Sequence, residues 1–140
     1  HLKDQFNPFI NQVVFSFENK LMGTAGALKK VERWLSDPFI VINGDTITNV
    51  NLKELLDAHK QAGNIATVFT HNDEIHTGGI YVFDKIVLSF IPPNKTYSIK
   101  DDLIPKLKKD KKNITLYNSD NYYFDIGTSL GLQKAKEFFE

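Results

Sequence analysis

A short apolar run that ends in a carboxylate constrains the fold of this chain more than any other feature. Residues 39–42 are Phe-Ile-Val-Ile, and Asn43, Gly44 and Asp45 follow them directly. A continuous apolar run of this length is typical of a strand buried in a parallel sheet. Ligands of open α/β sheets bind at the carboxyl ends of such strands. We therefore expect Asp45 to lie at that edge and to hold a metal ion or a polar ligand group, while Gly44 permits close backbone approach.

Alternating strand-like and helix-like segments predict an α/β fold with a mostly parallel sheet and helices packed on it. Strands are expected at residues 13–17, 38–42, 65–70, 78–83 and 114–117. Helices are expected after candidate N-caps at Thr24, Asn51, Ser98 and Thr128 or Ser129. In the last helix we expect an inward-facing apolar set of Leu130, Leu132, Ala135, Phe138 and Phe139.

Length and composition exclude several classes of protein. The 140 residues fit one domain, residues 1–140. The 17 basic and 17 acidic side chains balance, so we expect neither nucleic acid nor a membrane as a partner. The absence of cysteine excludes disulfides and thiolate chemistry and fits a reducing compartment. With no signal peptide and no membrane-spanning apolar stretch recognised, we expect a cytoplasmic protein. The oligomeric state stays open, and a homo-oligomer is compatible with the sequence.

Two aspartates follow apolar or aromatic runs in the same way. Asp45 follows Phe-Ile-Val-Ile-Asn-Gly, and Asp125 follows Tyr-Tyr-Phe. If these runs are neighbours in the fold, the two carboxylates converge on one hard cation, and Mg²⁺ suits such a pair because it takes one or two carboxylates plus waters and phosphate oxygens. The alternative is that each aspartate only caps a turn.

A small-residue segment, Gly23-Thr24-Ala25-Gly26, precedes the first predicted helix. Free amide groups and the positive end of a helix dipole would suit a phosphate or a nucleobase edge there. The segment matches neither the phosphate-loop pattern nor the dinucleotide fingerprint. Tight packing of the helix on the sheet is the alternative explanation for its small residues.

Two further polar segments are best explained as solvated surface. Residues 71–76 include His71 and His76 but provide no third anchored zinc ligand. The lysines within residues 106–112 are interrupted by Asp110 and have no aromatic residues between them. Neither segment therefore predicts a site.

Four motifs occur in an order that resembles the sugar-1-phosphate nucleotidylyltransferases. They are Leu-Met-Gly-Thr-Ala-Gly-Ala-Leu at residues 21–28, Val-Ile-Asn-Gly-Asp at 41–45, Gly-Gly-Ile-Tyr-Val-Phe at 78–83 and Phe-Asp-Ile-Gly-Thr at 124–128. The resemblance runs from about residue 13 to the end. Residues 97–105 look most like the D-glycero-D-manno-heptose 1-phosphate guanylyltransferases, with the mannose-1-phosphate guanylyltransferases second.

The resemblance implies a three-layer Rossmann-like nucleotide-diphospho-sugar transferase fold with helices on both faces of the sheet. It also implies transfer of a nucleotidyl group from a nucleoside triphosphate, GTP in this subfamily, to a sugar 1-phosphate, with release of pyrophosphate, for capsule or lipopolysaccharide synthesis. Site residues carried over from the motifs are Asp45 and Asp125 as catalytic Mg²⁺ ligands, Gly23, Thr24, Ala25, Asn43 and Gly44 at the nucleotide, and Thr77, Gly78 and Gly79 at the sugar.

Two departures from the family pattern predict an incomplete domain. No segment matches the family's glycine-rich loop with its arginine and lysine, and only residues 71–77 fill the interval that holds a Glu-Lys-Pro-like motif in the family. Each missing cationic group would cost roughly 3 kcal/mol of transition-state stabilisation. We therefore expect the 140 residues to be inactive alone. A non-catalytic sugar-nucleotide-binding or regulatory subunit is the rival hypothesis.

Overall fold

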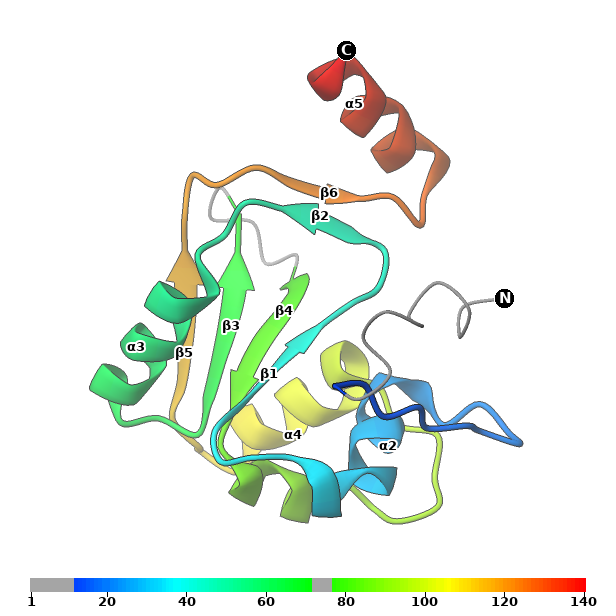
Figure 1. Ribbon diagram of the computed structural model, residues 1–140. Helices are drawn as coiled ribbons and strands as arrows, with labels where there is room; N and C mark the ends of the chain where they lie inside the picture. The colour runs from blue at the N-terminus through cyan, green and yellow to red at the C-terminus, as the bar shows by residue number, and fades with distance from the viewer. Residues whose placement is uncertain (1–11, 72–76) are drawn as a thin grey trace.

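The computed structural model describes residues 12–71 and 77–140, and its centre is a four-stranded sheet between two layers of helices (Figure 1). The strand order is β1 (Phe39–Ile42), β4 (Thr77–Phe83), β3 (Ala66–Thr70) and β5 (Ile114–Asn118). β4 is antiparallel to both β1 and β3, whereas β3 and β5 are parallel. β1, β3 and β5 therefore run in the same direction, and their carboxyl ends lie at the same edge.

The sheet is mixed rather than mostly parallel because β4 runs against the other three strands. Only residues 71–76 separate β3 from β4. A parallel connection needs a crossover of a dozen or more residues, so a link of this length returns the chain in the opposite direction. β1 consequently has one described neighbour, β4, and Ile42 at its end is exposed rather than buried.

A separate two-stranded ribbon crosses the sheet edge at which β1, β3 and β5 end (Figure 1). It pairs β2 (Thr46–Thr48) with β6 (Tyr123–Asp125) in antiparallel register, with Thr46 opposite Asp125 and Thr48 opposite Tyr123. Thr48 Oγ1 donates a hydrogen bond of 2.8 Å to the carbonyl of Tyr122. The ribbon joins segments more than 70 residues apart in sequence.

Helices cover both faces of the sheet, as the sequence predicted. On one face lie α2 (Gly23–Lys30), the helical turns η3 (Lys85–Phe90) and η4 (Ile99–Leu103), and α4 (Ile104–Lys109). Val68, Tyr81 and Phe83 of the strands pack there against Leu103 and Leu107. On the other face, α3 (Leu52–Ala62) packs Leu55 against Phe69, Ile80 and Val82. The alternation of strand side chains between two faces thus produces two cores.

Most of the predicted caps are confirmed. Asn51 Oδ1 accepts from the amides of Lys53 and Glu54 at the start of α3. Ser98 caps η4, and Thr128 caps α5 (Ser129–Phe139). Pro105 lies in the first turn of α4, where no helical amide donor is needed.

The cap prediction at Thr24 was wrong. α2 begins at Gly23, after Met22, and Thr24 Oγ1 instead accepts a 2.9 Å hydrogen bond from the amide of Ile99. α2 ends at Lys30, and one turn of 3₁₀ helix, η2 (Glu32–Trp34), follows it. Thr24 therefore joins two elements rather than starting one.

The strand predicted at residues 13–17 was also wrong. These residues have no regular secondary structure and pair with no described strand. Val14 and Phe17 are 69% and 66% exposed. The β-branched and aromatic residues that favour a strand stabilise one only where neighbouring strands provide packing.

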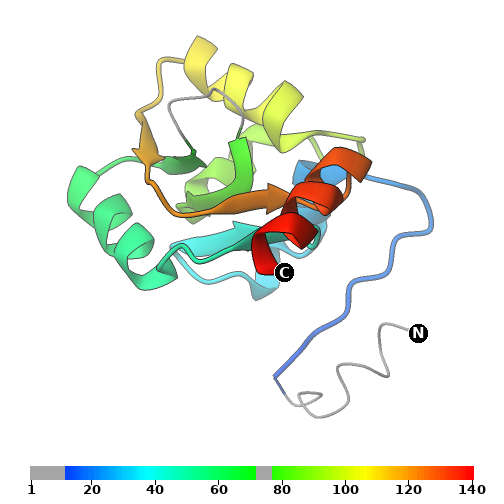
Figure 2. The same ribbon diagram turned by 90° about the horizontal axis from the view of Figure 1, so that it is seen from above.

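The inward face predicted for α5 is present only at Ala135, which is buried. Leu130, Leu132, Phe138 and Phe139 are exposed, because α5 extends away from the sheet (Figure 1). In the view from above, α5 lies at the end of β6 (Figure 2). The rings of Phe138 and Phe139 still contact Tyr122 at 5.1 and 5.5 Å between centroids. No helix within residues 12–71 and 77–140 combines the length and the apolar character needed to cross a bilayer.

Candidate functional site

Asp45 and Asp125 are brought together at one end of the β2–β6 ribbon. Asp125 ends β6 and is paired with Thr46, and the amide of Ile126 donates to the carbonyl of Asp45 at 2.9 Å. A Cβ added to Gly127 would lie 2.6 Å from Asp45 Oδ2 and 3.1 Å from Asp125 Oδ1. Both carboxylates therefore border the same small space, which is left open because residue 127 has no side chain.

The turn explanation applies to Asp125 but not to Asp45. Asp125 Oδ1 accepts a 3.0 Å hydrogen bond from the amide of Gly127, which is a local turn contact. Within the described residues, the Asp45 carboxylate accepts no hydrogen bond, and both carboxyl groups are exposed to solvent. Asp45 and the second oxygen of Asp125 thus keep lone pairs that could bind a cation.

The donor set at this point fits a hard cation of the magnesium type. Among residues 12–71 and 77–140, no cluster of three or more His, Cys, Asp or Glu side chains is arranged to hold a metal. Mg²⁺ does not need such a cluster, since it retains waters and shares its coordination with substrate phosphates. Two adjacent carboxylates beside an open space therefore suit it.

Tyr123 lies beside both aspartates on the ribbon. Burial raises the pKa of its phenol, and the negative charges of Asp125 and then Asp45 raise it further, while a hydrogen bond with the Thr46 side chain lowers it. The phenol therefore stays protonated and remains a hydrogen-bond donor next to the carboxylates.

A hollow of about 450 Å³ adjoins Asp125, and one of its lining side chains is a lysine that the sequence motifs did not identify. Its lining residues are His71, Tyr123, Phe124, Asp125, Thr128, Leu130, Gly131 and Lys134. Lys134 follows Leu130 by four positions, so the two share one side of α5. Only this i+4 relation to Leu130 could have identified Lys134, because six positions separate it from the cap at Thr128.

A second hollow, of about 470 Å³, adjoins Asp45 and is lined by Thr24, Asn43, Gly44 and Asp45. The structure thus brings together three residues from the predicted nucleotide set, although they come from two separate segments. Thr24 is the second residue of α2, whereas Asn43 and Gly44 follow β1.

Two of the amides at the start of α2 are not free, contrary to expectation. The amides of Ala25 and Gly26 donate to the carbonyl of Tyr97 at 2.9 and 3.1 Å. A Cβ at Gly23 or at Gly26 would lie 2.7 Å from a backbone oxygen, that of Tyr97 or Lys95 respectively. Tight packing therefore explains these two glycines, and Ala25 is buried, so Thr24 is the exposed member of the segment.

The glycines predicted to meet the sugar also pack closely. Gly79 has a φ of +65°, and a Cβ there would lie 2.7 Å from Asn43 Nδ2, while the amide of Asn43 donates to the carbonyl of Gly79 at 2.8 Å. A Cβ at Gly78 would lie 2.6 Å from a ring carbon of Phe69. Thr77 begins β4. The predicted sugar segment therefore contacts the predicted nucleotide segment directly.

Of the two segments predicted to be solvated surface, residues 71–76 are described only at His71, whereas the lysine-rich segment is described in full. Residues 72–76, which include His76, lie outside the described residues, and His71 lines the hollow at Asp125. Lys106 forms an exposed ion pair of 2.9 Å with Asp110, as expected of a solvated helix face.

Residues 1–78, more than half of the chain, match the family model described as nucleotidyl transferase. The chain is 26% identical over 151 residues to a D-glycero-alpha-D-manno-heptose 1-phosphate guanylyltransferase of Aneurinibacillus thermoaerophilus, covering 88% of this chain and 65% of that protein. It is 27% identical over 162 residues to a UTP–glucose-1-phosphate uridylyltransferase of Synechocystis, covering 83% of this chain and 42% of that protein. The chain thus spans less than two thirds of these curated relatives.

Solved structures resemble the whole chain. The crystal structure of HddC from Yersinia pseudotuberculosis complexed with GMP-PN has a TM-score of 0.77 and 22% identity, covering 99% of this chain and 73% of that one. A putative glucose-1-phosphate thymidylyltransferase from Bacillus anthracis has a TM-score of 0.75 and 21% identity, covering 99% and 72%. These similarities confirm the α/β, Rossmann-like fold, here incomplete.

Proposed function

The chain belongs to the nucleotidyl transferase family, and from that premise we propose that it is part of an enzyme that transfers a nucleotidyl group from a nucleoside triphosphate to a sugar 1-phosphate. Residues 1–140 would form one partial nucleotidyltransferase domain. The observation that carries the proposal is the convergence of Asp45 and Asp125 on the space beside Gly127. The reaction has the sugar phosphate attack the α-phosphorus and expel pyrophosphate, so it depends on positioning and charge neutralisation.

In this proposal Asp45 and Asp125 hold Mg²⁺. When bound, the ion would neutralise charge on the reacting phosphates. The chain itself fixes the two carboxylates through the paired β2–β6 backbone and through the hydrogen bond from Gly127 to Asp125. Tyr123 contributes a protonated hydroxyl, and Lys134 contributes a positive charge at the edge of the adjoining hollow.

We assign the nucleotide to the side of Asp45 that carries Thr24, Asn43 and Gly44, with Gly23 and Ala25 shaping the segment that presents Thr24. The sugar is assigned to Thr77, Gly78 and Gly79. Support comes from the contact between Gly79 and Asn43, which would place the two substrates side by side. Adjacent substrates are what an in-line transfer requires.

GTP and D-glycero-D-manno-heptose 1-phosphate are the substrates we propose. Support comes from the similarity to the heptose 1-phosphate guanylyltransferase of Aneurinibacillus thermoaerophilus and from the motif at residues 97–105. Mannose 1-phosphate is the second candidate, because a mannose-1-phosphate guanyltransferase of Candida glabrata is 28% identical over 148 residues. A cytoplasmic location, a role in surface polysaccharide synthesis and a homo-oligomeric state stay predictions.

The test is pyrophosphate release by the full-length protein, with GTP, ATP, UTP and dTTP each combined with heptose, mannose and glucose 1-phosphates. We expect the highest kcat/KM with GTP and heptose 1-phosphate. Asp45→Asn and Asp125→Asn should each lower kcat/KM by about 100-fold or more. Asp57→Asn is the matched control, because Asp57 is an exposed carboxylate on α3 that pairs with Lys53 at 3.4 Å.

Two results would contradict the proposal. Unchanged turnover in Asp45→Asn would exclude Asp45 as a metal ligand. Binding of a nucleotide sugar by the wild-type protein without any pyrophosphate release would instead favour the non-catalytic binding subunit.

A further inference from the structure

We propose that a lysine-lined cavity beside α2 binds an oligophosphate anion at a place separate from the proposed active site. The cavity has a volume of about 530 Å³. Its lining residues are Asn19, Lys20, Leu21, Met22, Lys29, Lys30, Pro93, Asn94, Lys95 and Thr96. None of them lines either hollow at Asp45 and Asp125, so the inference goes beyond the proposed function.

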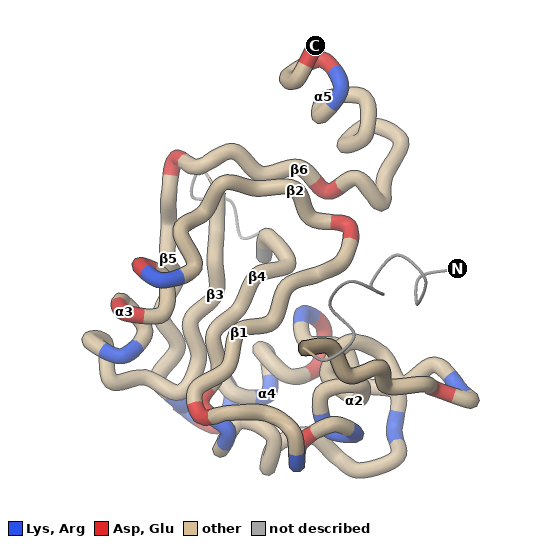
Figure 3. The backbone as a smooth tube through the Cα atoms, in the orientation of Figure 1, with Lys and Arg blue, Asp and Glu red and all other residues tan. Residues whose placement is uncertain are grey.

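Positive charge is concentrated at this cavity in a chain whose formal charges balance. Four of the ten lining residues are lysines, and none is acidic. They come from three segments: the loop before α2, the last turn of α2 and the loop at residues 93–96. Figure 3 shows Lys and Arg positions around α2 and the adjoining loops, with acidic positions among them. An anion in the cavity would be attracted from several sides at once.

Helix electrostatics explain only two of the four lysines. Lys29 and Lys30 lie in the last turn of α2, where cations stabilise the helix dipole. Lys29 also pairs with Glu32 at 2.8 Å, and Lys30 donates to the carbonyl of Phe17. Lys20 and Lys95 lie in loops and form no ion pair or side-chain hydrogen bond with any described residue. Their ammonium groups are therefore available to a ligand.

The backbone that carries these lysines is held in place. The amide of Tyr97 donates to the carbonyl of Met22 at 2.8 Å, and Thr96 Oγ1 donates to the carbonyl of Leu21 at 3.0 Å. The amide of Met22 donates to Glu18 Oε2 at 2.9 Å. These bonds join the loop of Lys20 to the loop of Lys95. The backbone that carries the two ammonium groups is therefore fixed before a ligand binds.

The chemistry of the lining selects the class of ligand. Lysine ammonium groups act as compact point charges that bind phosphate, and several of them match a chain of phosphates better than a single carboxylate. The volume lies within the range of about 300–1,000 Å³ found for small-molecule sites. Leu21, Met22 and Pro93 add apolar surface, which would contact an organic group attached to the phosphates.

The test uses inorganic tripolyphosphate and the full-length protein without Mg²⁺, with affinity measured by isothermal titration calorimetry and location by two-dimensional NMR. We expect amide shifts at Asn94, Lys95 and Thr96. The double variant Lys20→Gln/Lys95→Gln should bind about tenfold more weakly or worse. Lys20→Arg/Lys95→Arg keeps the charge and should bind within about threefold of wild type.

The matched control is Lys60→Gln/Lys108→Gln, which removes two exposed lysines on α3 and α4 outside the cavity. It should leave the affinity unchanged. The proposal is overturned if tripolyphosphate does not bind, if shifts are confined to residues 43–45 and 125–134, or if both glutamine pairs weaken binding equally.

GTP in place of tripolyphosphate tests the apolar surface, because tighter binding that still requires Lys20 and Lys95 assigns the site to a nucleotide. Equal binding assigns it to the phosphate chain alone, and both results support an oligophosphate site.

Discussion

The carboxylate of Asp45 lies against the backbone of Gly127. A Cβ on residue 127 would come within 2.6 Å of Asp45 Oδ2, which is closer than real Cβ contacts allow. Gly127 also donates its amide to the other carboxylate of the pair, that of Asp125, at 3.0 Å. Residue 127 therefore controls the positions of both acidic side chains.

Gly127→Ala should displace Asp45 and lower kcat/KM of the full-length protein by about 10- to 100-fold, because small misplacements of reacting groups have effects of this size. Its melting temperature should change little, since both carboxylates are exposed and can move. Gly44→Ala is the control for stability, because a Cβ at Gly44 meets no atom within 4 Å. Full activity in Gly127→Ala would show that the Asp45 position is not critical.

Much of this arrangement could be predicted from local sequence. The apolar run at β1 and the caps at Asn51, Ser98 and Thr128 depend on nearby residues, and the structure has them where expected. That Asp45 and Asp125 lie close together could be predicted only on the condition that their two segments are neighbours in the fold. It depends on β2, a strand of three residues, Thr46–Thr48, that is too short to give a periodic signal.

The wrong predictions concern residues whose contacts are with segments far away in the sequence. The amides of Ala25 and Gly26 are used by Tyr97, which lies more than 70 residues away and carries no signal of that contact. The apolar stripe of α5 has the spacing of a buried helix, yet the main contacts of α5 are with β6 of the narrow β2–β6 ribbon, and most of the stripe is exposed. A periodic pattern predicts which side of a helix is apolar but not how much surface is available to cover it.

Lys134→Gln should lower kcat/KM by about 10-fold while leaving the fold intact, because it removes a positive charge from the hollow at Asp125. The steady-state kinetics should show whether kcat or KM carries the loss. Lys136→Gln is the matched control, since Lys136 is exposed on the same helix and does not line that hollow. Equal effects of the two substitutions would indicate a general charge effect and no specific role for Lys134.

Tyr123 should make the folded protein less stable in alkali. Burial, followed by the charge of Asp125, raises the pKa of its phenol above the ordinary value of 10.0. Between the unfolded and the folded pKa the native state binds more protons, so the free energy of unfolding falls as pH rises through this window. The contribution is complete below the unfolded pKa and is lost as pH rises through the folded pKa. Urea unfolding between about pH 9 and pH 11 should show a shallower decline for Tyr123→Phe, and an identical decline would contradict this.

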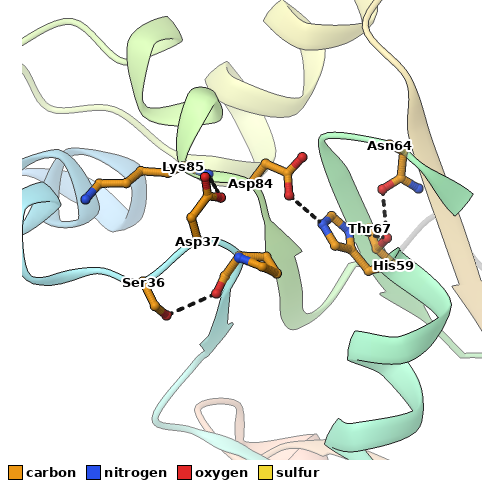
Figure 4. A network of polar contacts seen from close by, with 8 residues as sticks. Ser36, Asp37, His59, Asn64, Thr67, Asp84 and Lys85 are labelled. Carbon is orange, nitrogen blue, oxygen red and sulfur yellow. Dashed lines mark hydrogen bonds and ion pairs between the residues drawn. The ribbon is translucent and has the colours of Figure 1, made fainter. Parts of the chain in front are cut away.

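A buried polar network lies at the opposite edge of the sheet, where β4 ends (Figure 4). His59 is 2% exposed, and its Nδ1 and Nε2 atoms lie 2.9 Å from Thr67 Oγ1 and 3.1 Å from Asp84 Oδ1. Thr67 Oγ1 in turn donates to Asn64 Oδ1 at 3.3 Å. The hydroxyl of Thr67 therefore links α3 to β3 by satisfying two buried side chains.

Thr67→Val keeps the shape of the side chain and removes that hydroxyl, which leaves buried polar atoms of His59 and Asn64 without this partner. We expect the free energy of unfolding to fall by about 1–3 kcal/mol, measured by urea denaturation. Thr115→Val is the matched control, because Thr115 lies opposite Thr67 on β5, is only partly buried and makes no side-chain hydrogen bond with a described residue. A loss in Thr115→Val as large as that in Thr67→Val would assign the effect to threonine replacement in the sheet. Activity per folded molecule should not change in Thr67→Val, since the network lies at the edge away from Asp45 and Asp125.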